Sequence, residues 1–141
     1  MKRHLASLIA VLAALALLAG CGGEGEGEAT PTQARTDLDI SVWPSGRSGD
    51  QHEATLRCSP TGGSLPEAEE ACTRLETLER PFLRPGGQIA CTEIYGGPAV
   101  AQISGTFNGS EVDASFARSD GCEIALWDRH QFLFPVQPAS P

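Results

Sequence analysis

Two segments in the first half of the chain alternate apolar and polar residues, as half-buried strands do. The first is Thr36–Trp43 and the second is Glu53–Cys58. The residues expected to face inward are Leu38, Ile40, Val42, Ala54, Leu56 and Cys58. Both segments therefore predict strands with one face on a core.

A helical period follows the turn predicted at Ser59–Gly63. Ser64 and Glu67 have the spacing of a capping box, and a proline lies between them in the first turn. Apolar residues then recur at helical spacing, namely Ala68, Ala71, Cys72, Leu75 and Leu78. The pattern predicts a helix that runs to about Leu78, with Cys72 facing the sheet.

A hairpin is the clearest local signal in the second half of the chain. Pro98–Phe107 and Glu111–Ala117 have strand patterns, and Asn108–Gly109 between them favours a tight turn. We also expect a short helix at Glu123–Trp127 and a last strand at His130–Phe134. Five strand candidates and one strong helix predict an α+β fold, an antiparallel sheet with helices on one face.

The segment between the helix and the hairpin, Glu79–Gly97, is too long for a plain connector, and such loops are usually functional. Glycines and prolines bracket its central part, Gln88–Pro98. Inside it, the extended segment Thr92–Tyr95 directly follows Cys91. A segment anchored by a cysteine and hinged on glycines is suited to presentation to a protease as a substrate-like loop. The alternative is a cross-linked surface loop that has no partner.

The first twenty residues have the pattern of an export signal. A basic start precedes the apolar run Leu5–Leu18, which is too short to span a bilayer with these flanks. Leu18–Cys21 resembles a bacterial lipobox, in which the cysteine is lipid-modified and becomes the first mature residue. The alternative is an ordinary signal peptide followed by an unrelated cysteine. We expect lipidation at Cys21, which anchors the protein to the outer face of the cell membrane unless it is released.

The expected organisation has four parts. Residues 1–20 are the lipoprotein signal peptide, and 21–36 form a flexible acidic linker rich in Gly and Glu. Residues 37–135 form the folded domain, and 136–141 are a tail.

Charge narrows the range of partners. The 141 residues carry a formal net charge of −8, which becomes −10 when Lys2 and Arg3 leave with the signal peptide. This argues against nucleic acid and against an anionic lipid surface as ligands.

Four cysteines remain after Cys21, namely Cys58, Cys72, Cys91 and Cys122. In an exported domain they predict two disulfides, for which three connectivities exist. The sequence has no Cys-x-x-Cys pair, and no histidine is close to these cysteines. A metal site is therefore not expected.

An enzyme is not expected, and neither is a cofactor. The sequence has no Gly-x-Ser-x-Gly, no His-Glu-x-x-His and no phosphate-binding loop. A carboxylate pair could be formed by Asp113 and Glu123, but nothing favours it. His52 and His130 are expected on the surface. A binding module is the remaining class.

Four pieces around the cysteines carry a family resemblance: Ala54–Gly63, Glu70–Cys72, Cys91–Pro98 and Gly121–Trp127. In this order they resemble the subtilisin-inhibitor-like (SSI) family of bacterial serine protease inhibitors. The resemblance extends over about Leu38–Phe134. It implies a five-stranded antiparallel sheet with two helices, and members often form dimers through the sheet. A homodimer is therefore expected as a further partner.

The resemblance also implies the disulfides Cys58–Cys72 and Cys91–Cys122. The predicted elements agree with this pairing, since Cys58 ends a strand and Cys72 lies on the inner face of the next helix. The second bridge would clamp the loop that begins at Cys91 to the sheet.

In this family a substrate-shaped loop is presented to the protease and is cleaved extremely slowly. The family motif places Cys91 at P3, Thr92 at P2, Glu93 at P1, Ile94 at P1′ and Tyr95 at P2′. The scissile bond implied is Glu93–Ile94. The P1 side chain fills the S1 pocket of the protease and so selects the target.

Two positions depart from the family pattern. Members that block subtilisin usually carry Met, Leu or a basic residue at P1, where this chain has Glu93. Asp120 stands where the family often has an asparagine whose amide supports the loop. The expected partner is an extracellular serine protease of subtilisin-like, trypsin-like or Glu-specific type. The alternative function is a non-inhibitory binding module of a cell-envelope lipoprotein.

Overall fold

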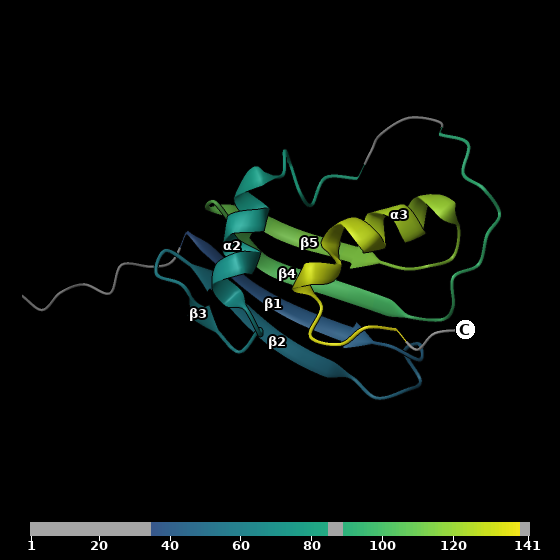
Figure 1. Ribbon diagram of the computed structural model, residues 1–141, viewed down its shortest axis with the longest axis horizontal. Coiled ribbons are helices and arrows are strands. Elements are labelled where there is room, and N and C mark those ends of the chain that lie inside the picture. Colours follow the sequence, from purple (N-terminus) through teal and green to yellow (C-terminus); the bar gives the residue numbers. More distant parts are fainter. Residues whose placement is uncertain (1–34, 85–88, 139–141) are drawn as a thin grey trace, which may run out of the picture. The chain divides into compact units, whose positions relative to one another are not determined.

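The central feature of the fold is one antiparallel sheet with helices on one of its faces (Figure 1). A computed structural model describes residues 35–84 and 89–138. The strands are β1 (Thr36–Trp43), β2 (His52–Cys58), β3 (Gly62–Gly63), β4 (Val100–Phe107) and β5 (Ser110–Phe116). The helices are α2 (Ala68–Thr77), α3 (Gly121–His130) and the short 3-10 helix η1 (Gln131–Leu133). The predicted α+β fold with five antiparallel strands and two α-helices is confirmed.

Several sequence predictions lie outside the described residues. These are the signal peptide, the lipidation at Cys21, nearly all of the linker, residues 85–88 of the long loop and the last three residues of the tail. None of the helices in the described ranges is long and apolar enough to cross a membrane.

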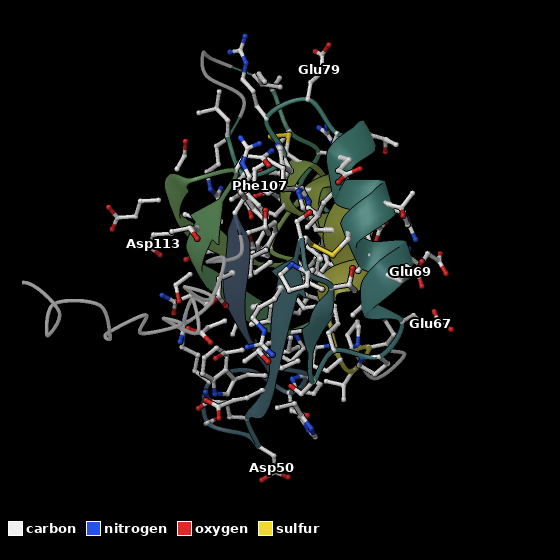
Figure 2. The ribbon with its side chains drawn as sticks, turned by 90° about the vertical axis from the view of Figure 1, so that its left-hand side faces the viewer. Asp50, Glu67, Glu69, Glu79, Phe107 and Asp113 are labelled. Carbon is white, nitrogen blue, oxygen red and sulfur yellow. A yellow bond between two sulfur atoms is a disulfide. The ribbon has the colours of Figure 1, made fainter. Side chains whose placement is uncertain are left out.

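Strand β1 is the centre of the sheet, whose order is β3-β2-β1-β4-β5. Leu38, Ile40 and Val42 are at most 1% exposed, as their alternation predicted. On the other face of the sheet the side chains are mostly polar, and the apolar exceptions Trp43 and Val100 form a pair at one end. Figure 2 shows this division, since Asp113 of β5 and Glu69 of α2 point outward on opposite sides.

The predicted hairpin is also confirmed. Phe107 of β4 pairs with Ser110 of β5, which leaves Asn108 and Gly109 as a two-residue turn. Both turn residues have positive φ, 50° and 80°, the conformation that favours Asn-Gly in such turns.

The fifth strand is β3, not the predicted strand at His130–Phe134. A Cβ atom on Gly63 would lie 2.1 Å from the carbonyl oxygen of Thr55, so only glycine allows this approach to β2. Ser64 then bonds to the same residue: its amide donates to the Thr55 carbonyl and its Oγ accepts from the Thr55 amide, both at 3.0 Å. A turn was predicted here because two glycines are too short a stretch to show alternation.

The predicted capping box is wrong because Ser64 is used by the sheet. Helix α2 begins at Ala68, and its N-cap residue Glu67 has a left-handed φ of 55° and no side-chain cap. The inner face of the helix is as predicted, with Ala71, Cys72 and Leu75 buried. The disulfide Cys58–Cys72 joins this face to β2.

The C-terminal region is helical. Helix α3 extends the predicted helix at both ends and runs directly into η1. Trp127, His130, Leu133 and Phe134 are all buried. Their spacing of three and four residues is helical, so the strand predicted at His130–Phe134 is wrong.

His130 is wholly buried and not on the surface, while His52 is exposed as expected. Its Nδ1 lies 2.8 Å from the Leu126 carbonyl oxygen and its Nε2 lies 2.6 Å from that of Pro81. Burial lowers the pKa of His130 below its usual value of 6.5, although the two carbonyl contacts oppose the shift. Through Pro81, this histidine connects α3 to the start of the long loop.

Candidate functional site

The candidate site is the loop between α2 and β4. The described parts of this loop, 79–84 and 89–99, contain no helix or strand, as predicted. In Figure 1 the green part of this loop passes beyond the N-terminal end of α3 before it joins β4. Val100, the first residue of β4, pairs with Trp43 at the end of β1. The last part of the loop therefore lies at the end of the sheet opposite to Thr36, whereas Phe82 in its first part packs on Phe107 beside the hairpin.

Cys91 and Thr92 are fixed to the first turn of α3. The disulfide Cys91–Cys122 has a Cα–Cα distance of 5.4 Å, and it confirms the pairing expected from the family resemblance. The amide of Gly121 donates to the carbonyl oxygen of Thr92 at 2.9 Å. A Cβ atom on Gly121 would lie 2.0 Å from Thr92 Oγ1, so the missing side chain makes room for Thr92.

Gly96 is fixed in the same way on the other side of the loop. Its amide donates to the carbonyl oxygen of Arg118 at 2.8 Å, and Nε of Arg118 donates to the Gly96 carbonyl oxygen at 2.9 Å. A Cβ atom on Gly96 would lie 2.9 Å from Cδ1 of Ile124. Both backbone polar groups of Gly96 thus bond to one residue, on the segment between β5 and α3.

The three residues between these fixed points project into solvent. Glu93 is exposed, and the exposed fractions of Ile94 and Tyr95 are 57% and 69%. One local hydrogen bond, from the Ile94 amide to the Thr92 carbonyl oxygen at 2.9 Å, closes a turn around Glu93. The backbone here is therefore held at both sides and by its own turn, while the side chains stay accessible.

Exposed apolar side chains are concentrated on this loop. In the described ranges the large hydrophobic residues that are exposed are Leu83, Ile89, Ile94 and Tyr95. All four lie between α2 and β4, although the surface elsewhere includes the outer faces of two helices and one face of the sheet. Of these residues, Ile94 and Tyr95 are neighbours in the chain, and exposed apolar residues that lie together are typical of a protein interaction surface.

Glu93 makes no ion pair within the described part of the chain. Two arginines near the loop are used elsewhere: Arg84 pairs with Glu123, and Arg118 pairs with Asp128 at 3.3 Å. The Glu93 carboxylate is therefore available to a cation of a partner.

Asp120 is the N-cap of α3. Its Oδ1 accepts hydrogen bonds from the amides of Cys122 and Glu123 at 2.9 and 3.0 Å, and Oδ2 accepts from Ser119 Oγ at 3.3 Å. None of its side-chain hydrogen bonds within the described residues reaches the loop. Asp120 acts on the loop through α3, because it fixes the helix start that carries Gly121 and Cys122.

Three supporting residues were not found from the sequence: Arg84, Arg118 and Gly121. Arg84 donates to the Ser115 carbonyl oxygen at 2.6 Å and pairs with Glu123, so it fastens the first part of the loop to β5 and α3. A glycine at the start of a helix was a usable signal for Gly121. The sequence contains no pattern that singles out either arginine, since both act through contacts distant in the chain.

The described residues do not form a carboxylate pair from Asp113 and Glu123, and they do not form a metal site at the cysteines of the loop. Asp113 faces outward on the sheet face opposite α3, so it does not form a carboxylate pair with Glu123. Cys91, Asp120 and Cys122 bring potential metal ligands within 4.8 Å of one another, but the two sulfur atoms are bonded to each other. A disulfide offers no thiolate to a metal.

The sequence was compared with curated proteins and with models of protein families. Comparison with curated proteins gave no match. The family model described as subtilisin inhibitor-like matches residues 32–119, which is more than half of the 141 residues. The match includes β1 to β5, α2 and the whole candidate loop. The chain therefore belongs to the subtilisin inhibitor-like family, whose members are inhibitors of serine proteases and not enzymes.

Proposed function

We propose that this protein inhibits a serine protease by presenting Cys91–Tyr95 as a substrate-like reactive loop, with Glu93–Ile94 as the scissile bond. The observation that carries the proposal is the contrast within the loop. Thr92 and Gly96 are fixed by hydrogen bonds to Gly121 and Arg118, and the residues between them are exposed.

Rigidity is what separates an inhibitor from a substrate. A loop that is already held in its bound conformation loses little entropy on binding, so its contact energy appears as affinity. The disulfide to Cys122 and the bond to Gly121 restrain the segment before the scissile bond. The Arg118 contacts restrain the segment after it. Neither restraint depends on the scissile bond being intact.

The proposed target is a protease whose S1 pocket accepts a carboxylate. Placing the Glu93 carboxylate in an apolar pocket without a partner costs several kcal/mol. Within the described residues, Glu93 has no ion-pair partner that could enter such a pocket with it. A Glu-specific serine protease would supply the missing partner, whereas subtilisin would not.

We further propose that the domain is exported and tethered through a lipid on Cys21. The position of the first residues of β1 supports this arrangement, because Asp37 pairs with Thr106, six residues along each strand from the Trp43–Val100 pair that lies beside the end of the loop. The point at which the linker joins β1 is thus at the end of the sheet opposite to the part of the loop that directly precedes β4. If a Cys21→Ser protein remains in the membrane fraction to the same extent as the wild type, the lipid anchor is ruled out.

The inhibitor proposal is tested by exchanging one carboxylate. Glu93→Leu should strengthen inhibition of subtilisin by tenfold or more, and it should weaken inhibition of a Glu-specific protease. Glu79→Leu is the matched control, since Glu79 is also exposed and lies on the same loop. Glu79→Leu should change the inhibition of neither protease. Absence of inhibition below the micromolar range against subtilisin-like, trypsin-like and Glu-specific enzymes would contradict the proposal for these targets.

A further inference from the structure

Arg118 occupies an unusual position for a charged residue next to a binding loop. Its side chain is only 19% exposed, and its guanidinium lies 5.9 Å from the ring centroid of Trp127. Nε donates to the Gly96 carbonyl oxygen, and Nη1 pairs with Asp128 at 3.3 Å. The backbone carbonyl of the same residue accepts from the Gly96 amide. The side chain is thus held in one orientation by contacts on three sides.

The two sides of the proposed scissile bond are held by different means. Before the bond, the chain is attached covalently through Cys91–Cys122 and by the Thr92–Gly121 hydrogen bond. After it, between Ile94 and the start of β4, the hydrogen bonds that join the described backbone to the rest of the domain are the two between Gly96 and Arg118. The second side therefore depends on one residue.

This asymmetry matters after the protease attacks. The serine Oγ of the protease forms an ester with the Glu93 carbonyl carbon, the Glu93–Ile94 bond breaks, and the serine proton passes through the protease base to the Ile94 nitrogen. The Ile94 amine can then attack the ester, which restores the peptide bond and returns the proton to the serine. Water competes for the same ester and leaves a permanently cleaved inhibitor.

We infer that Arg118 is a positioning residue that keeps the Ile94 amine beside the acyl-enzyme, so that the peptide bond re-forms faster than water hydrolyses the ester. The inference rests on the proposed function. Gly96 is two residues from Ile94, so holding Gly96 confines the amine to a small volume. Confinement of a reactive group raises its effective concentration by orders of magnitude.

An ion pair with Asp128 alone would not explain the position of Arg118. Asp128 is 56% exposed, and exposed ion pairs contribute little to stability. The planar guanidinium holds Nε toward the Gly96 carbonyl and Nη1 toward Asp128 in a fixed geometry, whereas a lysine ammonium is a single point charge on a flexible chain. Asp128→Asn therefore removes the ion pair and keeps the loop contact, while Arg118→Lys keeps the charge and loses the paired geometry.

The test measures inhibition and cleavage separately, with the full-length protein and a Glu-specific serine protease. Each variant is mixed with the enzyme, and mass spectrometry follows the cleaved form while residual activity follows inhibition. Arg118→Gln should accumulate the form cut at Glu93–Ile94 at least tenfold faster than the wild type, so that inhibition is temporary. Arg118→Lys should be intermediate, and Asp128→Asn should behave as the wild type.

Circular dichroism at the assay temperature identifies the variants that are folded, and a lost fold in Arg118→Gln leaves Arg118→Lys to decide by the same readout. A wild-type rate of cleavage in a folded Arg118 variant, with a wild type that does inhibit, would overturn this inference alone. A wild-type protein that neither inhibits nor is cut at Glu93–Ile94 would overturn the proposed function and this inference with it.

Discussion

Gly121 donates its amide hydrogen to the carbonyl oxygen of Thr92 at 2.9 Å, and a side chain on Gly121 would overlap Thr92 Oγ1 at 2.0 Å. The contact joins the first residue of α3 to the residue that precedes Glu93. The absence of a side chain at one position therefore sets the geometry of the proposed reactive loop.

Gly121→Ala should weaken protease inhibition by tenfold or more while the domain stays folded. The methyl group displaces Thr92, whereas helix propensity alone would favour alanine over glycine by up to about 1 kcal/mol. Inhibition constants and urea unfolding measure the two effects. Gly62→Ala is the control, since the neighbour its methyl group meets, at 3.3 Å, is the end of the flexible Arg57 side chain. Equal inhibition by Gly121→Ala and the wild type would contradict the role of this contact.

The two disulfides should differ in function more than in stability. Their sequence separations of 14 and 31 predict losses of about 3 and roughly 3.5 kcal/mol when Cys58–Cys72 or Cys91–Cys122 is replaced by a serine pair. The bridge Cys58–Cys72 lies between α2 and β2, away from the loop. Its removal should leave the folded protein inhibitory, while removal of Cys91–Cys122 should convert the loop to a substrate.

Urea titration and time-dependent inhibition assays measure these effects under conditions where each variant is folded. If the protein without Cys91–Cys122 inhibits as durably as the protein without Cys58–Cys72, the disulfide Cys91–Cys122 is not what makes the loop resistant to cleavage.

Asp120 should matter as a helix cap. Asp120→Ala leaves the amides of Cys122 and Glu123 without their acceptor and should lower the free energy of unfolding by about 1 kcal/mol. Asp120→Asn should be nearly neutral, because its amide oxygen can accept the same bonds. Chemical denaturation of both variants checks this. A large loss in Asp120→Asn would show that the charge itself, and not the cap, is what the fold requires.

His130 should make the protein less stable in mild acid. Burial lowers its pKa in the folded state below the value of 6.5, so the unfolded chain binds the proton more readily. The free energy of unfolding therefore falls as the pH drops below about 6.5, by up to about 1.4 kcal/mol per pH unit until the lowered pKa is reached. Above this window the contribution is fully present.

The comparison of wild type with His130→Gln isolates this effect, since the acidic residues are common to both. Urea unfolding between pH 4.5 and 7.5 should show a smaller pH dependence in the variant. Parallel curves for the two proteins would mean that His130 does not take up a proton on unfolding in this range.

The elements with strong local patterns were predictable, and the contacts between them were not. β1 and the Asn108–Gly109 hairpin follow from alternation and turn chemistry, which act within a few residues. The use of Ser64 was mispredicted because its hydrogen bonds to Thr55 outweigh its capping potential, and this depends on the close approach of Gly63. His130 was mispredicted because a polar residue can be buried where carbonyl groups meet it.

Some features of the loop were likewise predictable from local sequence, and others were not. Its existence, its exposure and its cysteine anchor were readable from glycines, prolines and the position of Cys91. Its support by Arg118 was not, because an arginine on a connecting segment has no local signature and meets Gly96 only when the chain has folded.

The most direct test of the central claim is intact-mass spectrometry of the wild-type protein mixed with a Glu-specific serine protease. We expect a stoichiometric complex and, over long incubation, one slowly formed product that is cut between Glu93 and Ile94 and still joined through Cys91–Cys122. Rapid digestion at several sites with no complex, or a single cut at another bond of the loop, would contradict the central claim.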